Sequence, residues 1–180
     1  GFAEVPGNIK QEFLIERRFG GLDGFERSEM LQLGHRHMLA DILRHKESDP
    51  SYVPVTMPNT PQLRMTRRID GCYTLDDTQN GEHFTDSIGI ISDWRKPGPV
   101  YEIPFRCLYG KKIKNLITAG RCISVTDAMW DISRVIPACA VTGQAAGTAA
   151  AMSNDFSVLD ISALRKNLTG VQTDISTVLS

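Results

Sequence analysis

The spacing of hydrophobic residues in the first third of the chain predicts one long helix. Between residues 25 and 45, apolar side chains recur near helical spacing and predict an amphipathic helix of about five turns. These positions are Met30, Leu31, Leu33, Met38, Leu39, Ile42 and Leu43. Prolines at positions 50, 54, 58 and 61 exclude a helix from residues 46–62, which we expect to form an extended connection.

The middle of the chain has patterns that are typical of strands. Residues 63–69 alternate apolar and basic side chains, and the turn signal Asp70-Gly71 leads to a second predicted strand at residues 72–75. Residues 84–92 are mostly apolar and predict a buried strand or a short helix. Residues 100–106 are strand-like, and Pro104 limits them to an edge or an end.

Residues 114–152 predict a strand, an elbow, a loop and a helix. Residues 116–119 read as a short buried strand that stops at Gly120, and Pro137 at the first helical position opens a helix that runs to about Met152. Glycine costs about 1 kcal/mol relative to alanine in a helix. Gly143 and Gly147 therefore suggest that something approaches this helix closely. Asp160 can cap a short helix at residues 161–168 that ends at Gly170.

The start of this small-residue helix is a candidate binding site. A helix N-terminus presents free N–H groups and a partial positive charge, which suit an anion or a ring oxygen that becomes negative. Arg134, just before the helix, would add a full charge. The alternative is that the small residues serve only to pack the helix on a sheet, and the spacing alone does not decide between the two.

Composition narrows the class of protein. Hydrophobic residues make up 41% and charged residues 23% of the chain, as in soluble globular proteins. The net charge is −1 with dispersed Lys and Arg, so neither nucleic acid nor a membrane is a predicted partner. Gly143 and Gly147 match the small-residue motif of membrane helices, but the Ala, Gly, Thr and Gln around them fit a soluble helix better.

The cysteines and histidines give no metal signature. Cys72, Cys107, Cys122 and Cys139 form no Cys-x-x-Cys pair, and we interpret them as buried free thiols in a reducing, cytoplasmic environment. His35 and His37 are two residues apart on the predicted helix and point to different faces, so no metal site is predicted.

Several ordered segments resemble a known family. Residues 115–124, 134–139 and 142–151 closely resemble the C-terminal motif of the FAD-dependent oxidoreductase family, flavoproteins with a glutathione-reductase-like FAD-binding fold. Residues 67–75 and 101–106 look like two further family segments in the expected order. The resemblance covers about residues 60–170.

The resemblance implies an α/β fold, or α+β for the isolated piece. Residues 63–112 would form part of a β-rich, substrate-facing subdomain, and residues 113–170 the C-terminal strand and helix of an FAD/NAD(P)-binding-type fold. Residues 1–62 would supply the helical segment and the extended connection, and residues 171–180 a tail.

The dinucleotide fingerprint of such flavoproteins, Gly-x-Gly-x-x-Gly after a strand, does not occur in the sequence. In the family it lies at the N-terminus of a longer chain, and this chain opens on Gly1 without a methionine. We therefore expect a longer parent with the missing N-terminal FAD-binding portion. The piece alone would hold FAD weakly, would be inactive, and could self-associate through surfaces meant for the missing half.

The resemblance also implies a function, in which the parent oxidises a small organic substrate by hydride transfer to FAD. The residues that would border the cofactor are Gly120, Arg121, Arg134, Val135, Ile136, Pro137, Ala138, Cys139, Thr142, Gly143, Gln144 and Gly147. Those that would face the substrate are Arg67, Arg68, Tyr101 and Arg106.

Two questions stay open at this point. Neighbouring Arg67 and Arg68 would face opposite sides of a strand, so one could clamp a substrate carboxylate, although a surface arginine pair and a core Tyr101 explain these residues equally well. Many relatives have histidines near Trp94 and residues 127–130, where this chain has none, so no catalytic base is named and the role of His83 is open. The alternative function is a non-catalytic binding or interaction module without flavin.

Overall fold

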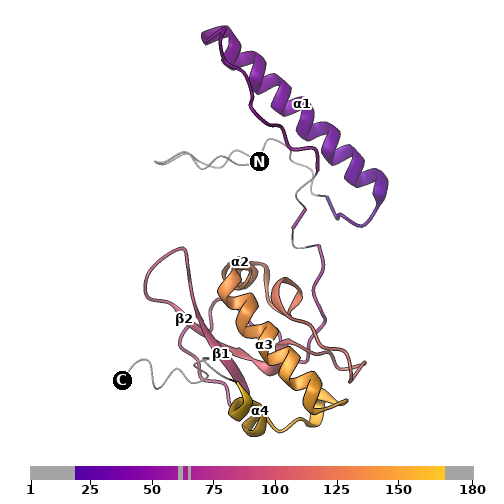
Figure 1. Cartoon of the computed structure of the whole chain (residues 1–180), viewed down its shortest axis with the longest axis vertical. Coiled ribbons are helices and arrows are strands. Elements are labelled where there is room, and N and C mark those ends of the chain that lie inside the picture. The colour runs from indigo at the N-terminus through magenta and orange to yellow at the C-terminus, as the bar shows by residue number, and fades with distance from the viewer. Residues whose placement is uncertain (1–18, 61–62, 65, 169–180) are drawn as a thin grey trace. The chain divides into compact units, whose positions relative to one another are not determined.

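The computed structural model describes residues 19–60, 63–64 and 66–168. The chain divides into two units, Gly1–Thr66 and Arg67–Ser180, and each is described by itself. Across the described residues the architecture is a mixed α/β arrangement of four helices and a two-stranded antiparallel sheet (Figure 1).

The first unit consists of helix α1 (Gly24–Ser48) and the segment that follows it. Asp23 caps the helix by accepting a 3.0 Å hydrogen bond from the Phe25 N–H. The predicted helix is confirmed and runs on to Ser48. None of its residues is buried, so the described part of this unit does not cover the apolar side chains of the helix.

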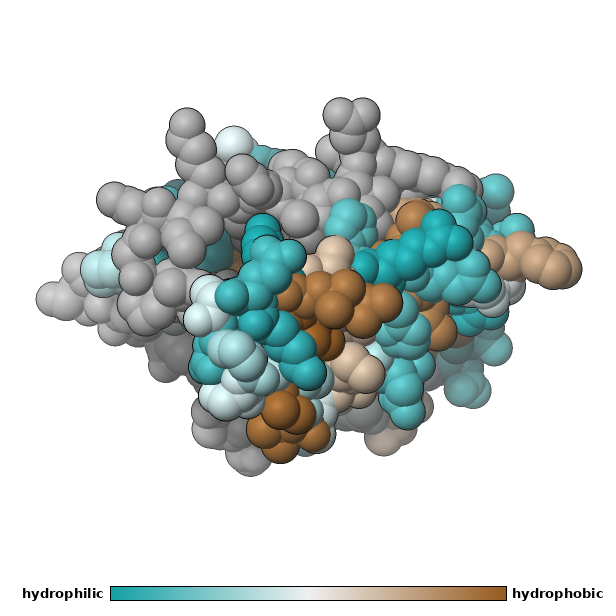
Figure 2. All heavy atoms as spheres, turned by 90° about the horizontal axis from the view of Figure 1, so that it is seen from above, coloured by the Kyte–Doolittle hydropathy of each residue, from teal (hydrophilic) through white to brown (hydrophobic). Residues whose placement is uncertain are grey.

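The proline-containing connection is extended, as predicted. Residues 49–60 contain no helix or strand and run back beside α1 in Figure 1. A 3.0 Å hydrogen bond between His35 Nε2 and the Pro58 carbonyl joins the two segments. On the face that Figure 2 shows, hydrophobic side chains are interspersed among hydrophilic ones.

The second unit is built on strands β1 (Ser87–Ser92) and β2 (Val100–Pro104), which pair antiparallel with an irregular register between Ser87 and Ile90. The strand predicted at residues 100–106 is confirmed and ends at Pro104, and the segment predicted at residues 84–92 as a strand or a short helix forms a strand. Ile88 and Ile103 are fully buried and anchor the sheet in the hydrophobic core.

The predicted hairpin of residues 63–75 is wrong. The backbone N–H groups of Ile69, Cys72 and Leu75 donate to carbonyls of residues 122, 109 and 124 instead of to each other. Because these bonds go to two distant segments, the described residues of this stretch form isolated bridges at Gly71 and Leu75 instead of a hairpin. Gly71 fits this close approach, since a Cβ there would lie 2.5 Å from the Ser124 Cβ.

The predicted buried strand at residues 116–119 is also wrong. Its ladder is limited to one bridge between Ile117 and Tyr109, and the Leu116 side chain is 47% exposed. In the described ranges the sheet consists of β1 and β2, so no further strand pairs with residues 116–119.

Helix α2 (Asp127–Ser133) replaces the loop that was expected between the elbow and the long helix. The Thr126 hydroxyl caps it by accepting a 3.4 Å bond from the Met129 N–H, and Met129, Trp130 and Ile132 are buried. A capping threonine followed by these apolar residues was the sequence signal for the helix.

Helix α3 (Ile136–Met152) confirms the prediction and begins one residue before Pro137. Its inner face packs against β1 and consists of Ala138, Thr142, Ala145, Ala146 and Ala149. Gly143 and Gly147 lie on the exposed face, with nothing within 4 Å of a Cβ built there. Within the described chain, these two glycines therefore do not serve helix-on-sheet packing.

The last described helix, α4 (Ile161–Asn167), also follows the prediction. Asp160 accepts hydrogen bonds from the N–H groups of Ser162 (2.8 Å) and Ala163 (3.3 Å), and Leu164 is fully buried. The expected end at Gly170 and the predicted tail at residues 171–180 lie outside the described residues.

In the described ranges no single helix is long and apolar enough to cross a bilayer. Helices α2 and α3 together have the length and composition of a membrane span, but they are bent by 92° at the break between them.

Candidate functional site

The elbow at Gly120 sits against the first turns of α3. Gly120 has φ of 66°, a left-handed conformation that favours glycine, and its N–H donates to the Thr142 hydroxyl at 2.9 Å. That hydroxyl donates in turn to the Ala138 carbonyl at 2.9 Å. A Cβ at position 120 would lie 3.3 Å from the Cys139 Sγ, so a side chain there would press on the helix.

The N-terminus of α3 is open. Val135 occupies the cap position without a side-chain hydrogen bond, and Ile136 is 80% exposed. Pro137 has no N–H, so the Ile136 and Ala138 N–H groups carry the positive end of the helix dipole. Ile136 leaves this end open to solvent, whereas Ala138 is 1% exposed and faces the core.

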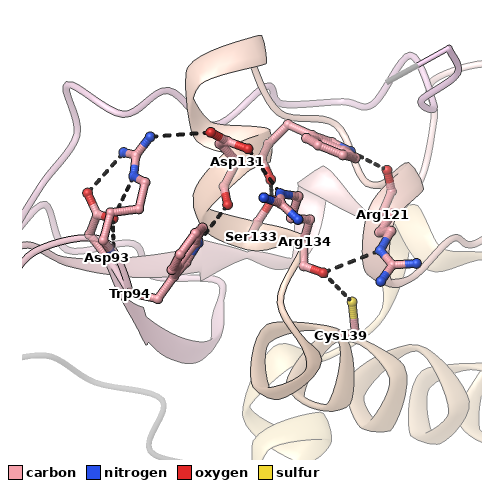
Figure 3. A network of polar contacts seen from close by, with 9 residues as sticks. Asp93, Trp94, Arg121, Asp131, Ser133, Arg134 and Cys139 are labelled. Carbon is pink, nitrogen blue, oxygen red and sulfur yellow. Dashed lines mark hydrogen bonds and ion pairs between the residues drawn. The ribbon is translucent and has the colours of Figure 1, made fainter. Parts of the chain in front are cut away.

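Arg134, just before α3, uses its side chain within the chain. Its Nε donates to Asp131 Oδ1 at 2.9 Å, and its guanidinium carbon lies 5.6 Å from the Trp94 ring centre and 5.5 Å from that of Trp130. Its carbonyl oxygen instead faces the start of α3, where it accepts hydrogen bonds from Arg121 Nε (3.4 Å) and Cys139 Sγ (3.6 Å) (Figure 3).

The loop between β1 and β2 adds Trp94 to this region. The Trp94 indole N–H donates to the Asp131 carbonyl at 2.9 Å, and the side chain remains 51% exposed (Figure 3). Beside it, Arg95 binds the Asp93 carboxylate through two hydrogen bonds of 2.8 and 3.0 Å and lies 3.7 Å from Asp131. Residues 92–100 line a shallow pocket over this loop.

The Asp93 carboxylate makes acid stability testable. The side chain is 1% exposed, and the hydrogen bond from Arg95 holds its pKa below the ordinary value. Because the folded pKa lies below the unfolded value of about 3.9, the contribution of the ionised Asp93 to stability is complete above about pH 4 and is lost as the pH falls through the folded pKa.

We expect Asp93→Asn to lower stability near neutral pH and to flatten the loss of stability in acid, measured as urea midpoints at several pH values. Asp70→Asn, at an exposed position, should keep the wild-type profile. Parallel profiles for wild type and Asp93→Asn would contradict this assignment.

The predicted substrate residues lie in three different environments. Arg67 and Arg68 are both exposed, because no strand forms there, and Arg68 donates to the Ser124 hydroxyl at 2.9 Å. Tyr101 is a core residue whose hydroxyl donates to the Asp77 carbonyl at 3.0 Å, and burial raises its pKa. Arg106 binds Asp86 through two side-chain hydrogen bonds of 2.9 and 3.1 Å, which raise its pKa.

All four cysteines are free, as predicted, but only Cys107 is buried. The interpretation of buried thiols is thus wrong for Cys122, which is exposed. In the parts of the chain that the structure describes, no group of three or more His, Cys, Asp or Glu side chains is placed to hold a metal ion.

The difference between Cys107 and Cys122 predicts selective alkylation. Burial raises the pKa of the Cys107 thiol to about 12, so the reactive thiolate is scarce at pH 8. We expect iodoacetamide to modify Cys122 in the native protein and to modify Cys107 only in denaturant, as read by peptide mass spectrometry. Modification of Cys107 at the rate of Cys122 in the native protein would show that the core around it is open.

Two features of the site were missed in the sequence. Trp94 contacts Arg134 from 40 positions away, whereas the sequence singled it out only as a position near which many relatives have a histidine. Glu102 is fully buried, and its carboxylate accepts hydrogen bonds from the Phe84 N–H (2.7 Å) and contacts His83 Nδ1 (3.1 Å). Strand alternation would put Glu102 on the face opposite Tyr101 and Ile103, so the sequence pattern offers no signal of its burial.

Comparison with known proteins adds the family to this geometry. The sequence model described as FAD dependent oxidoreductase matches residues 18–168, and the chain belongs to this family. The match begins well before residue 60 and thus includes α1. No curated protein and no solved structure matches the chain significantly.

Proposed function

We propose that the protein is a piece of an oxidoreductase that uses FAD to oxidise a small organic substrate. In this proposal the chain is the C-terminal portion of a glutathione-reductase-like flavoprotein, and a longer parent carries the dinucleotide fingerprint that residues 1–180 lack. Membership of the family and the open start of α3 support it.

The observation that carries the proposal is the arrangement around the α3 N-terminus. The exposed Arg121, the Gly120 elbow and the uncapped first turn of α3 meet at one place. Backbone N–H groups and a guanidinium are the donors that suit an electron-rich ring or a phosphate. These donors fit FAD, whose flavin, when bound, accepts the hydride of the substrate.

Each part of this corner has a proposed task. Arg121 and the N–H group of the exposed Ile136 would stabilise negative charge at the cofactor. Gly120 leaves room because it has no side chain, and a Cβ there would already touch Cys139. The exposed Gly143 and Gly147 would let another segment of the parent lie close to α3.

The structure reduces the number of arginines that are available to bind a substrate. Asp86 already occupies the hydrogen-bonding edge of the Arg106 guanidinium that Nε and one terminal nitrogen form, whereas Arg67 and Arg68 are exposed. We therefore favour Arg67 and Arg68 for a substrate carboxylate, which a guanidinium binds through two parallel hydrogen bonds.

Titration with FAD tests this function. The longer natural form should perturb the flavin absorbance spectrum and quench its fluorescence at stoichiometric concentration, and the 180-residue chain should do so only weakly. A longer form that leaves the flavin spectrum unchanged would contradict the proposed function.

A further inference from the structure

The Arg134 side chain is held by contacts on several sides, although the residue comes just before the open N-terminus of α3. Its guanidinium contacts the Trp94 and Trp130 rings at 5.6 and 5.5 Å and pairs with Asp131, which leaves its side chain 26% exposed. An arginine is attracted to the face of a tryptophan ring, and the stacking removes rotamer freedom that a free side chain would keep. Trp94, Trp130, Asp131 and Arg134 are called the tryptophan cluster below.

The tryptophan cluster also fixes Arg121. The Trp130 indole N–H donates to the Arg121 carbonyl at 2.9 Å, and the Arg134 carbonyl accepts from Arg121 Nε at 3.4 Å (Figure 3). One bond holds the Arg121 backbone and the other holds the near end of its guanidinium. The two terminal nitrogens of Arg121 lie beyond that bond, on an exposed residue.

The two arginines differ in how their charge is used. Arg134 pairs with the carboxylate of Asp131, whereas Arg121 contacts a carbonyl, which does not neutralise it. An anion at the start of α3 therefore gains more from Arg121 than from Arg134. The role of Arg134 follows from its contacts, since it ties Arg121 to the corner between α2 and α3.

We propose that Trp94 and Trp130 are positioning residues that lock Arg134 and, through its carbonyl, aim the Arg121 guanidinium at a ligand anion. The inference rests on the proposed function for the identity of the ligand as FAD. It adds two residues, from the β1–β2 loop and α2, that the family motif does not include.

The lock itself can be measured without a ligand. The chain has two tryptophans, and both contact Arg134, so intrinsic fluorescence reports on this cluster alone. We expect Arg134→Ala to change the emission intensity and wavelength. The matched control is Arg44→Ala, which removes an arginine that pairs with an aspartate three residues earlier, Asp41, on the helix of the other unit. Unchanged emission in Arg134→Ala would overturn the lock.

Binding tests the aim of Arg121. In the longer natural form, we expect Trp94→Leu to weaken FAD binding about tenfold, and Trp94→Phe to restore it to within about threefold because an aromatic face remains. Circular dichroism checks that each variant is folded. Because Trp94 is half exposed, we expect its replacement to leave the fold intact.

The outcomes separate the two proposals. Wild-type affinity in a folded Trp94→Leu variant would overturn the positioning role and leave the proposed function intact. Absence of FAD binding in the wild type would contradict the proposed function, and the emission comparison of Arg134→Ala with Arg44→Ala would then decide whether the lock exists.

Discussion

Replacing Phe105 by alanine is expected to lower the free energy of unfolding by about 3–5 kcal/mol, because it removes a buried ring and leaves a cavity. Phe105 is 1% exposed, and its ring centre lies 5.3 Å from that of Tyr109. It begins the short turn Phe105–Cys107 that follows β2.

This turn is expected to matter because it organises the second unit. The Phe105 N–H donates to the Asp86 carbonyl, and the carbonyls of Cys107 and Tyr109 accept from Ser124 and Cys72. Loss of the ring would loosen the segments that lead to Gly71 and to the Gly120 elbow. Urea denaturation followed by circular dichroism gives the free energy.

The control is Phe25→Ala, which removes the same ring from a side chain that is 88% exposed on α1. Its effect should stay within about 0.5 kcal/mol, as for most surface changes. Equal losses of stability in Phe105→Ala and Phe25→Ala would show that the core is not where the structure places it.

Reversing the charge at Arg121 is expected to weaken FAD binding by the proposed longer parent about 100-fold. A hydrogen bond to a charged group contributes about 1.5–3 kcal/mol, and about 1.4 kcal/mol corresponds to a factor of ten. Arg121→Glu removes such a bond and places a carboxylate beside the open start of α3. The dissociation constant from flavin fluorescence titration measures the effect.

Arg44→Glu is the matched charge reversal for this experiment, since Arg44 is an exposed arginine on α1. It should leave the affinity for FAD unchanged. If Arg121→Glu also binds FAD like the wild type, no anion lies at Arg121 and the placement of the cofactor at the α3 N-terminus is wrong.

Elements whose signals are local could be predicted from the sequence. The apolar spacing of α1, the proline near the start of α3 and the Asp160 cap of α4 each lie within the element that they define. The same holds for β2, which Pro104 ends. In each case, periodicity and capping chemistry act over a few residues.

Elements that depend on distant partners could not be predicted in this way. The pattern of residues 63–75 suits a hairpin, but Ile69 and Leu75 find their hydrogen-bond partners more than 40 positions away. Residues 116–119 are apolar enough for a buried strand, yet they make a single bridge in the described part of the chain. Strand formation depends on neighbours, which a single sequence does not reveal.

The candidate site likewise has features that the sequence predicts and features that depend on distant residues. The family motif predicts that Gly120, Arg121, Arg134 and Thr142 belong together, and the hydrogen bonds of the elbow do bring them to the start of α3. The motif gives no reason for Arg134 to turn toward Asp131 and two tryptophans. That direction depends on the β1–β2 loop, which meets α2 only in the folded chain.

Amide hydrogen exchange of the proposed longer parent with and without FAD tests the placement of the cofactor most directly. We predict that FAD slows exchange at Ile136, at the exposed start of α3, and at Arg121, because a bound ligand protects the amides that it covers. Tight FAD binding that leaves both of these amides exchanging as fast as in the free protein would contradict the account.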